Sequence, residues 1–423
     1  MLQRKSLTAW LPLGHQVRLT WCGDHAYNSA ISCSPKLRPG SAAGGIEVVA
    51  EAPTGRNRRV KRPRLNRTHI SVVLLALALL GGCRRPKDIA WSFATPRPWV
   101  LASDSQLLTP VVDGDVVFFC GGYAEREGSA IYALEAQTGK LKWQFGVGSC
   151  VAPPIVASGV LVSFAAAQHG DRIEVSGLDK VVGRQQWKVE LPGNPQPPAP
   201  VLMGNFVFFA PGSRSVLRID VRDGSIQTFD VDTNVAAASP WLAGTHGEVL
   251  FGYGKSYWRS RTDSETPEAG TPLSVPVESP VGLGTDGRSL LLADQNGNLI
   301  SFNLQKGNVT WEHHWNKILS APLIADGKVF VDVYEQKYAL AALALASGNE
   351  MWRIQQGSTE APYWQDGRIY VASGTSVSIV DGASGKIQRR FAAPTEVITT
   401  PIPDGDLVLF GTARGVLYAA TTH

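Results

Sequence analysis

The side chains with chemistry to offer in this 423-residue chain are a few histidines, cysteines and carboxylates, and their spacing does not suit catalysis. His313 and His314 are the one adjacent histidine pair, within the segment Trp311-Glu312-His313-His314-Trp315. Adjacent residues on an extended strand point to opposite sides, so a metal site there would need further ligands that the sequence does not supply. We therefore expect a polar loop between repeats. No Gly-x-Ser-x-Gly, Walker or Cys-x-x-Cys pattern occurs after residue 88.

Two further cysteines, Cys120 and Cys150, follow Cys83 in the chain. Cys120 ends a strand-like run, and Cys150 lies in a predicted loop. An oxidising compartment permits a bridge between them, while two buried small residues is the more common interpretation of such a pair. Carboxylates form no cluster at ligand spacing, so we expect no calcium cage, no other metal and no cofactor. The sequence predicts a protein that is not an enzyme and has no catalytic residues.

Cys83 has a more specific setting. A dense positive run over 56–67 precedes an apolar stretch of 13 residues, Ile70–Gly82, and the cysteine follows directly. This order is typical of a secretory signal, and the stretch is shorter than the roughly 20 residues of a transmembrane helix. Leu80-Gly81-Gly82-Cys83 resembles the lipobox of bacterial lipoproteins, which implies a diacylglyceryl group on Cys83 and cleavage before it. A simple secretory signal with a chance cysteine is the alternative.

The domain boundaries follow from this leader. We predict a lipoprotein signal peptide over 60–82, then the lipidated cysteine and a short linker over 83–88, which places the body close to a membrane surface. Residues 1–59 show no sustained periodicity and fit no part of a signal, which should begin within about five to ten residues of its apolar run. We expect an unstructured extension and hypothesise that synthesis starts near Val60 or Leu65. Peptides from 1–55 found in cells by mass spectrometry would contradict this.

The net charge of +4 averages two unlike parts. Residues 1–82 hold 12 Lys and Arg against 3 Asp and Glu, whereas 83–423 hold 28 against 33. A mildly acidic body has no electrostatic footprint for nucleic acid, so nucleic acid is not an expected partner.

An internal repeat organises residues 89–423. A small residue followed by proline recurs eight times, at intervals of 39 to 46 residues, and a glycine turn follows each proline. The prolines are Pro110, Pro154, Pro200, Pro240, Pro280, Pro322, Pro362 and Pro401, and the glycines are Gly114, Gly159, Gly204, Gly244, Gly284, Gly327, Gly367 and Gly405. Short β-branched and aromatic runs flank these turns, as expected of strands buried on both faces. Each repeat has the length of one propeller blade.

A second glycine turn recurs only seven times, and tryptophan stands four residues after four of these glycines. The glycines are Gly139, Gly183, Gly224, Gly270, Gly307, Gly348 and Gly385, followed by Trp143, Trp187, Thr228, Ser274, Trp311, Trp352 and Arg389. The chain ends where the eighth turn and its strand should come, and the segment around Trp91 resembles that missing strand. We therefore predict an all-β, eight-bladed propeller that an N-terminal strand closes, which removes an exposed sheet edge.

The segment from Ile131 to Trp143, Ile-Tyr-Ala-Leu-Glu-Ala-Gln-Thr-Gly-Lys-Leu-Lys-Trp, resembles the pyrroloquinoline-quinone-type propeller repeat. Similar copies end at Trp311 and Trp352. The resemblance implies that tryptophans dock between neighbouring blades, and it assigns this structural role to Trp91, Trp143, Trp187, Trp311 and Trp352. Quinone-dependent alcohol dehydrogenases share the repeat, but they are longer, and their disulfide joins adjacent cysteines, unlike Cys120 and Cys150.

With its lipobox, repeat type and circular closure, the chain resembles the BamB family of outer-membrane-protein assembly lipoproteins. The resemblance implies a non-enzymatic scaffold, lipid-anchored in the outer membrane and facing the periplasm, that binds an envelope protein such as the β-barrel insertase. Residues 190–200 do not show that family's charged docking loop, so no docking residues are carried over. The alternative is a propeller whose central funnel binds a small ligand or a quinone.

Irregular stretches at 121–128 and 259–270 interrupt the repeat. Loops on a rigid ring often bind partners, although tolerated, solvated insertions are the more common explanation of such stretches. Trp99, Trp258 and Trp364 stand outside the docking offset. They are either surface anchors or part of the strand packing.

Overall fold

The computed structural model describes two compact units, Met1–Arg85 and Pro86–His423, and each is presented by itself. The described residues are 4–10, 16–22, 47–49, 88–95, 109–122, 129–167, 172–193, 199–211, 215–230, 241–245, 248–253, 256–261, 268–272, 280–294 and 296–422.

The first unit contains a three-stranded sheet of order β1-β2-β3, formed by Arg4–Trp10, Gln16–Cys22 and Glu47–Val49. The prediction that residues 1–59 are unstructured is wrong for these three segments. In β2 the apolar residues Val17, Leu19 and Trp21 alternate with polar ones, a short period-two pattern that a search for sustained periodicity passes over. The predicted signal peptide and Cys83 lie outside the described residues.

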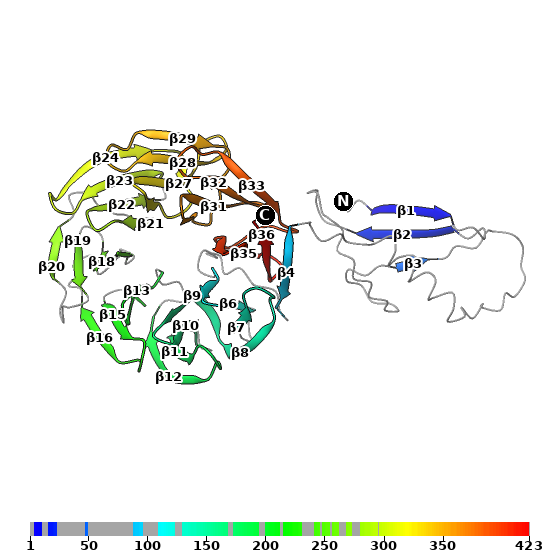
Figure 1. Ribbon diagram of the computed structural model, residues 1–423, viewed down its shortest axis with the longest axis horizontal. Coiled ribbons are helices and arrows are strands. Elements are labelled where there is room, and N and C mark those ends of the chain that lie inside the picture. The colour runs from blue at the N-terminus through cyan, green and yellow to red at the C-terminus, as the bar shows by residue number, and fades with distance from the viewer. Residues whose placement is uncertain are drawn as a thin grey trace, which may run out of the picture. The chain divides into compact units, whose positions relative to one another are not determined.

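The second unit is a ring of eight antiparallel blades, which confirms the predicted propeller (Figure 1). Along the chain, blade 1 comprises β5 (Val111–Asp113), β6 (Val116–Gly122), β7 (Ser129–Glu135) and β8 (Leu141–Val147). Blade 2 comprises β9 (Ser149–Ala157), β10 (Val160–Ala166), β11 (Arg172–Asp179) and β12 (Gln185–Pro192). Blade 3 comprises β13 (Val201–Met203), β14 (Phe206–Phe209), β15 (Ser215–Asp220) and β16 (Ile226–Asp230).

The next three blades repeat this order. Blade 4 comprises β17 (Trp241–Thr245), β18 (Glu248–Tyr253), β19 (Ser256–Arg261) and β20 (Glu268–Pro272). Blade 5 comprises β21 (Pro280–Thr285), β22 (Ser289–Asp294), β23 (Asn298–Asn303) and β24 (Asn308–His314). In blade 6 the first strand is split into β25 (Lys317–Ile318) and β26 (Leu323–Ala325), which both pair with β27 (Lys328–Tyr334), and β28 (Tyr338–Ala344) and β29 (Glu350–Ile354) follow.

Blade 7 comprises β30 (Tyr363–Gln365), β31 (Arg368–Ser373), β32 (Ser376–Asp381) and β33 (Ile387–Ala392). Blade 8 takes β34 (Ile402–Asp404), β35 (Leu407–Thr412) and β36 (Val416–Thr421) from the C-terminal end of the chain and β4 (Ile89–Ala94) from the start of the unit. The register pairs Val416 with Ala94 and Ala420 with Ile89. The predicted closure by an N-terminal strand is therefore confirmed.

The core lies between blades as well as within them. All six residues of β35 are buried, as expected of a strand covered on both faces. Between blades 2 and 3, Phe164 of β10 packs on Phe209 of β14 with ring centroids 5.1 Å apart. Each blade therefore buries one face against each neighbour, which is why the strands read as continuous apolar runs.

Three of the predicted glycine turns are wrong. Gly244 and Gly284 lie inside β17 and β21, and Gly270 lies inside β20. A Cβ atom on Gly244 would be 2.2 Å from a methyl group of Val201 in the neighbouring blade, so glycine there permits close packing of first strands. In blade 5 the turn instead contains Gly287, which has a φ of +84°.

Candidate functional site

Five tryptophans on fourth strands reach the next blade around the ring. Each indole donates a hydrogen bond from Nε1 to a backbone carbonyl oxygen in the turn between the third and fourth strands of that blade. The pairs are Trp91 with Ala136 (2.9 Å), Trp143 with Lys180 (3.1 Å), Trp187 with Val221 (2.9 Å), Trp311 with Leu345 (2.7 Å) and Trp352 with Gly382 (3.3 Å). The structure thus places all five predicted residues at one equivalent position and in contact with the neighbouring blade.

At each of these contacts a glycine lies beneath the indole, and Gly183 shows why. Its φ is +70°, and a Cβ atom on it would be 2.5 Å from the ring of Trp143. Both the backbone conformation and the stacked indole therefore exclude a side chain at this position. The spacing of glycine and tryptophan in the repeat is a consequence of this packing. In blades 1, 2 and 6 the turn glycine lies beneath the tryptophan of the preceding blade, and the tryptophan four residues later reaches the turn of the next blade.

The contact between blades 7 and 8 uses an ion pair. Arg389 has the tryptophan position on β33, and its Nη2 lies 2.8 Å from Oδ1 of Asp88, the residue before β4. In blade 8 the third and fourth strands come from opposite ends of the unit, so there is no connecting turn for an indole to cover. Asp88 occupies that place, and its carbonyl oxygen accepts a hydrogen bond from the amide of Thr421 (2.8 Å).

The contact between blades 3 and 4 is a column of stacked aromatic rings. Phe208 and Phe229 of blade 3 continue into Phe251 and Trp258 of blade 4, with centroid separations of 6.4, 6.4 and 6.1 Å and interplanar angles of 12°, 17° and 11°. Thr228 has the tryptophan position on β16. Stacked aromatic pairs contribute about 0.5–1.5 kcal/mol each beyond the area they bury, so this column is a second way to join blades.

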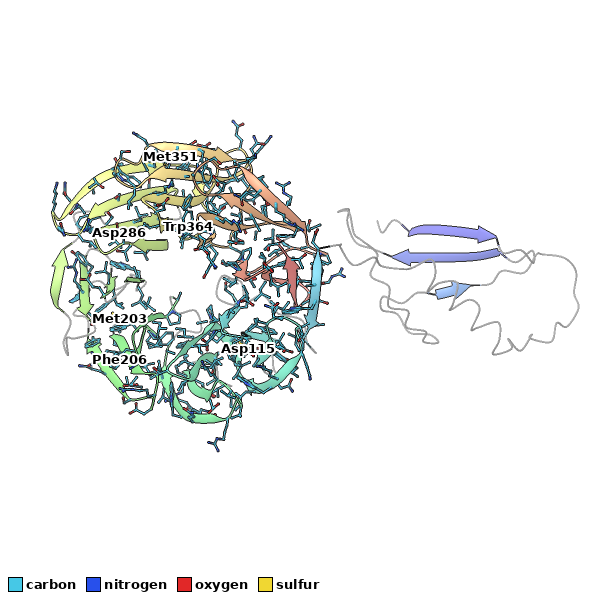
Figure 2. All side chains as sticks on the ribbon, in the orientation of Figure 1. Asp115, Met203, Phe206, Asp286, Met351 and Trp364 are labelled. Carbon is cyan, nitrogen blue, oxygen red and sulfur yellow. A yellow bond between two sulfur atoms is a disulfide. The ribbon has the colours of Figure 1, made fainter. Side chains whose placement is uncertain are left out.

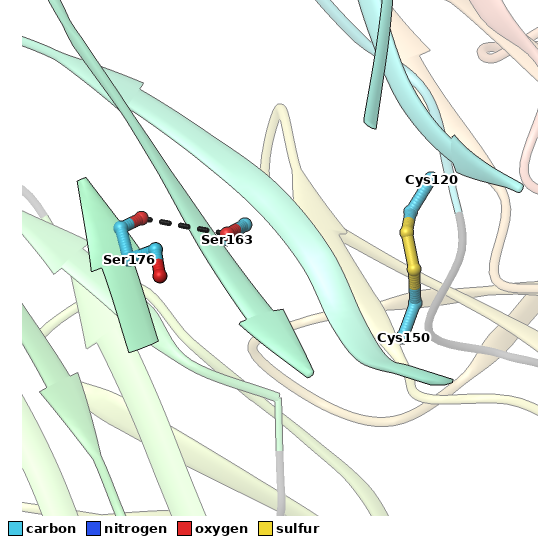
Figure 3. The surroundings of a disulfide bond; sticks show 4 residues. All are labelled: Cys120, Cys150, Ser163 and Ser176. Atoms are coloured by element: carbon cyan, nitrogen blue, oxygen red, sulfur yellow. Dashed lines mark hydrogen bonds between the residues drawn. A yellow bond between two sulfur atoms is a disulfide. The ribbon is translucent and has the colours of Figure 1, made fainter. Parts of the chain in front are cut away.

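Cys120 and Cys150 form a disulfide (Figure 3). Cys120 lies on β6 of blade 1 and Cys150 on β9 of blade 2, with Cα atoms 6.3 Å apart. The interpretation as two unbridged buried residues is therefore wrong. The sequence could not reveal the pairing, because it depends on which strands of adjacent blades lie together.

The histidine pair lies on β24 and diverges, as expected for neighbours on a strand. His313 hydrogen-bonds the carbonyl oxygen of Gly348 in blade 6 and stacks on Trp315 at 5.2 Å, whereas His314 is exposed and lies 2.9 Å from Oδ1 of Asn298. The predicted polar loop is thus a strand, and the two imidazoles have separate structural roles. Among the described residues, no group of three or more His, Cys, Asp and Glu could hold a metal ion.

Two buried carboxyl groups at the junction of blades 6 and 7 are the most unusual polar feature of the described ring. Asp332 lies within β27, accepting a hydrogen bond from the Ser320 hydroxyl (3.1 Å) and one from the amide of Ser358 (3.2 Å). Glu360 follows Ser358 in the segment that joins the blades, and its amide donates to the Ser358 hydroxyl (3.0 Å). Oε2 of Glu360 has no hydrogen-bond partner within the described part of the chain.

Burial raises the pKa of Asp332 to about 8, against the opposing effect of the hydrogen bonds from Ser320 and Ser358. The pKa of Glu360 is also raised to about 8, mainly by burial and further by the charges of Asp332 and Glu396. Both groups therefore hold a proton at neutral pH. In this neutral form the two carboxyls are hydrogen-bonding groups of the junction between blades 6 and 7. An acidic residue inside the apolar run Val329–Val333 was the sequence signal for it.

The other predicted residues take structural places or lie outside the described regions. Trp258 belongs to the aromatic column, and Trp364 on β30 stacks on Phe330 of blade 6 at 5.5 Å, nearer the centre of the ring than Met351 in Figure 2. Both therefore serve strand packing. Trp99 lies outside the described residues, as do 123–128 and 262–267 of the irregular stretches and 194–198 of the segment compared with the docking loop. The ends of the 259–270 stretch belong to β19 and β20, paired through Arg259 and Glu268.

Comparison with known proteins identifies the family of this ring. The family model described as "Outer membrane protein assembly factor BamB" matches residues 87–231, 252–363 and 336–423, which together make up most of the chain. A protein of that name from Moranella endobia (strain PCIT) is 20% identical over 302 residues, covering 70% of this chain and 69% of the relative. Within the described residues, no helix has the length and apolar character needed to cross a membrane.

Solved structures share the architecture at low identity. The crystal structure of BamB from Moraxella catarrhalis superposes with a TM-score of 0.57 at 15% identity, covering 79% of this chain and 99% of that one. A quinohemoprotein alcohol dehydrogenase from Pseudomonas putida gives a TM-score of 0.56 at 12% identity, covering 79% of this chain and 76% of the enzyme. At these identities the likeness shows the fold alone, because one fold serves many functions.

Proposed function

The chain belongs to the family of the outer membrane protein assembly factor BamB, and we propose that it is a non-enzymatic, lipid-anchored scaffold that supports assembly of outer-membrane proteins. The family match along the propeller carries this proposal. The ring acts as a rigid frame whose loops bind protein partners in the cell envelope, the β-barrel insertase first among them. Cleavage removes the signal peptide over 60–82 and leaves Cys83 as the first residue of the mature chain. The lipid on Cys83 anchors the ring in the outer membrane, where it faces the periplasm.

The disulfide supports an exported location. Structural disulfides persist in oxidising compartments such as the bacterial periplasm and are rare in the cytosol. Cys120 and Cys150 belong to neighbouring blades, so their bridge forms once the ring has brought β6 and β9 together. This argument is independent of the comparisons, because it rests on the chemistry of the chain itself.

Catalysis has little support among the described residues. The histidines and tryptophans that drew attention in the sequence hydrogen-bond or stack within the blade contacts. Asp332 and Glu360 are buried and protonated at neutral pH, whereas a calcium cage uses ionised carboxylates. The alternative function, a propeller that binds a small ligand or a quinone, is therefore supported by the shared fold alone.

The test is recovery of partners from membranes. The full chain with a C-terminal affinity tag is expressed in a strain lacking the endogenous copy, and bound proteins are identified by mass spectrometry after mild detergent extraction. We expect the β-barrel insertase to be enriched over abundant lipoproteins, and loss of the gene to lower the level of outer-membrane β-barrels. A Cys83→Ala variant controls for proteins that are recovered merely because they share the membrane. Enrichment of abundant lipoproteins alone, with unchanged β-barrel levels, would overturn the proposal.

A further inference from the structure

The turns between third and fourth strands lie along one rim of the propeller, which we call the outer-turn rim. The members described are Gln137-Thr138, Val181-Val182, Arg222-Asp223, Gln305-Lys306, Ala346-Ser347 and Ala383-Ser384, with the glycine of each turn following. Turns between first and second strands share this rim, since the amide of Lys180 donates to the carbonyl oxygen of Gly159 (3.1 Å).

The closing strand β4 also begins at the outer-turn rim. Asp88 precedes it and pairs with Thr421 through the backbone, and the amide of the next residue, Thr422, donates to the carbonyl oxygen of Asp406 (2.8 Å) beside the first turn of blade 8. From β4, Trp91 reaches the outer turn of blade 1, and Trp143 in turn reaches the outer turn of blade 2. The chain therefore enters the ring at the rim that carries Val181 and Val182, two blades away.

Val181 and Val182 are the most exposed large apolar residues of the described chain, with 72% and 62% of their surface open to solvent. Their turn is well ordered by its own hydrogen bonds. Oδ1 of Asp179 accepts from both valine amides, at 2.9 and 3.1 Å, and the carbonyl oxygen of Asp179 accepts from the amide of Gly183. The backbone is satisfied within the turn, so the two isopropyl groups project from a fixed loop.

The corresponding positions of the other described outer turns each include at least one polar residue. Solvated turns favour such residues, so a pair of aliphatic side chains at a turn tip departs from the pattern of this repeat. Neither valine is needed for the contact with blade 1, because Trp143 uses the carbonyl of Lys180 and the face of Gly183. The pair is therefore available for contact with something outside the ring.

We propose that the Val181-Val182 tip rests in the interfacial layer of the phospholipid membrane that holds the lipid on Cys83. The inference rests on the proposed lipid anchor. Four residues lie between Cys83 and Asp88, so five Cα-to-Cα steps limit the span to roughly 17 Å of extended chain. The outer-turn rim is therefore the part of the ring held nearest the membrane. Aliphatic side chains near a cation suit the boundary of headgroups and acyl chains, and the exposed Arg184 stands two residues after Val182.

The test places a polarity-sensitive fluorophore on the tip of the lipidated full chain. Cys120 and Cys150 are bridged and Cys83 would be acylated, so Val182→Cys supplies the thiol for labelling. Tyr338→Cys is the matched control, because Tyr338 is 54% exposed and lies at the start of β28, at the opposite rim. On binding to vesicles of phosphatidylethanolamine and phosphatidylglycerol, we expect the emission of the label at 182 to shift to the blue and that at 338 to stay unchanged. Val181→Asp beside the label should abolish the shift.

Flotation of the same samples separates the two proposals. Vesicles that carry the protein to the top of a density gradient show that the anchor is present. Flotation with no spectral shift at 182, or with a shift at 338 instead, would overturn the tip contact and leave the anchor intact. Failure to float would show that the lipid anchor itself is wrong. A shift at 182 that soluble proteins cause in the absence of vesicles would assign the tip to a protein partner and also overturn the inference.

Discussion

The buried carboxyl pair makes the stability of the ring depend on pH in a range where ordinary carboxylates do not titrate. In the folded chain Asp332 and Glu360 keep their protons up to a pKa of about 8, whereas in the unfolded chain they lose them near the ordinary pKa values of 3.8 and 4.5. Between these limits the folded state binds more protons, so the free energy of unfolding falls as pH rises. Each group contributes a slope of about 1.4 kcal/mol per pH unit, and the pair about 2.7.

Replacing Asp332 by asparagine should halve that slope. The amide keeps the shape of the carboxyl, and the Ser320 hydroxyl can rotate to accept a hydrogen bond from it. Glu360 keeps a raised pKa, because burial rather than the neighbouring charge is its main cause. From pH 5.5 to 7.5 we therefore expect a loss of about 5 kcal/mol in the wild type and about 3 kcal/mol in Asp332→Asn, as upper limits.

The assay is urea unfolding followed by tryptophan fluorescence at constant ionic strength and at several pH values. Glu312→Gln, which removes an exposed carboxylate from β24, is the control and should leave the slope unchanged. An Asp332→Asn slope equal to that of the wild type would refute the reasoning, because it would mean that Asp332 is already ionised in the folded ring.

Three further predictions concern the contacts between blades. Gly183→Ala should lower the free energy of unfolding in urea more than Gly114→Ala does. Both glycines have a positive φ, at +70° and +60°, but only at Gly183 would a Cβ atom meet an indole. Equal losses of unfolding free energy would contradict the packing argument. Reducing the disulfide, or replacing both Cys120 and Cys150 by serine, should lower the free energy of unfolding by up to about 4 kcal/mol, because the bridge closes a loop with a 30-residue separation. Urea midpoints that are the same with and without reductant would contradict this prediction. Asp88→Asn should lower the free energy of global unfolding by less than about 1 kcal/mol, because the ion pair with Arg389 is partly exposed. The same change should speed amide hydrogen exchange in β4. Unaltered exchange there would show that the ion pair does not hold the closing strand.

Much of the fold follows from the repeat, for identifiable reasons. Proline lacks an amide hydrogen and is tolerated where a strand starts, so Pro322, Pro362 and Pro401 mark the residues just before β26, β30 and β34. The one missing second turn predicted the closure, because a ring closed by the start of the unit must lack one connecting turn. The tryptophan offset likewise reflects a contact that five of the blades make with the next.

The sequence could not supply what depends on contacts between particular strands. The pairing of Cys120 with Cys150 requires that β6 and β9 be neighbours in space, and the aromatic column between blades 3 and 4 shows no fixed spacing that could reveal it. Gly244 and Gly284 resemble turn glycines, but they lie inside strands, where atoms of a neighbouring blade leave no room for a side chain. Burial of Asp332 is a property of the assembled junction, although its place in an apolar run was a visible signal.

The contacts near the chain entry suggest how the ring could bear load from an anchor. A pull on Cys83 would enter at Asp88, where the backbone pairs with Thr421 and the side chain with Arg389. β4 passes the load to blade 8 through its ladder with β36 and to blade 1 through Trp91. The disulfide then ties blade 1 covalently to blade 2. Opening the ring at its closure would thus require breaking a strand ladder, an ion pair and an indole contact together, which is the behaviour that a tethered scaffold needs.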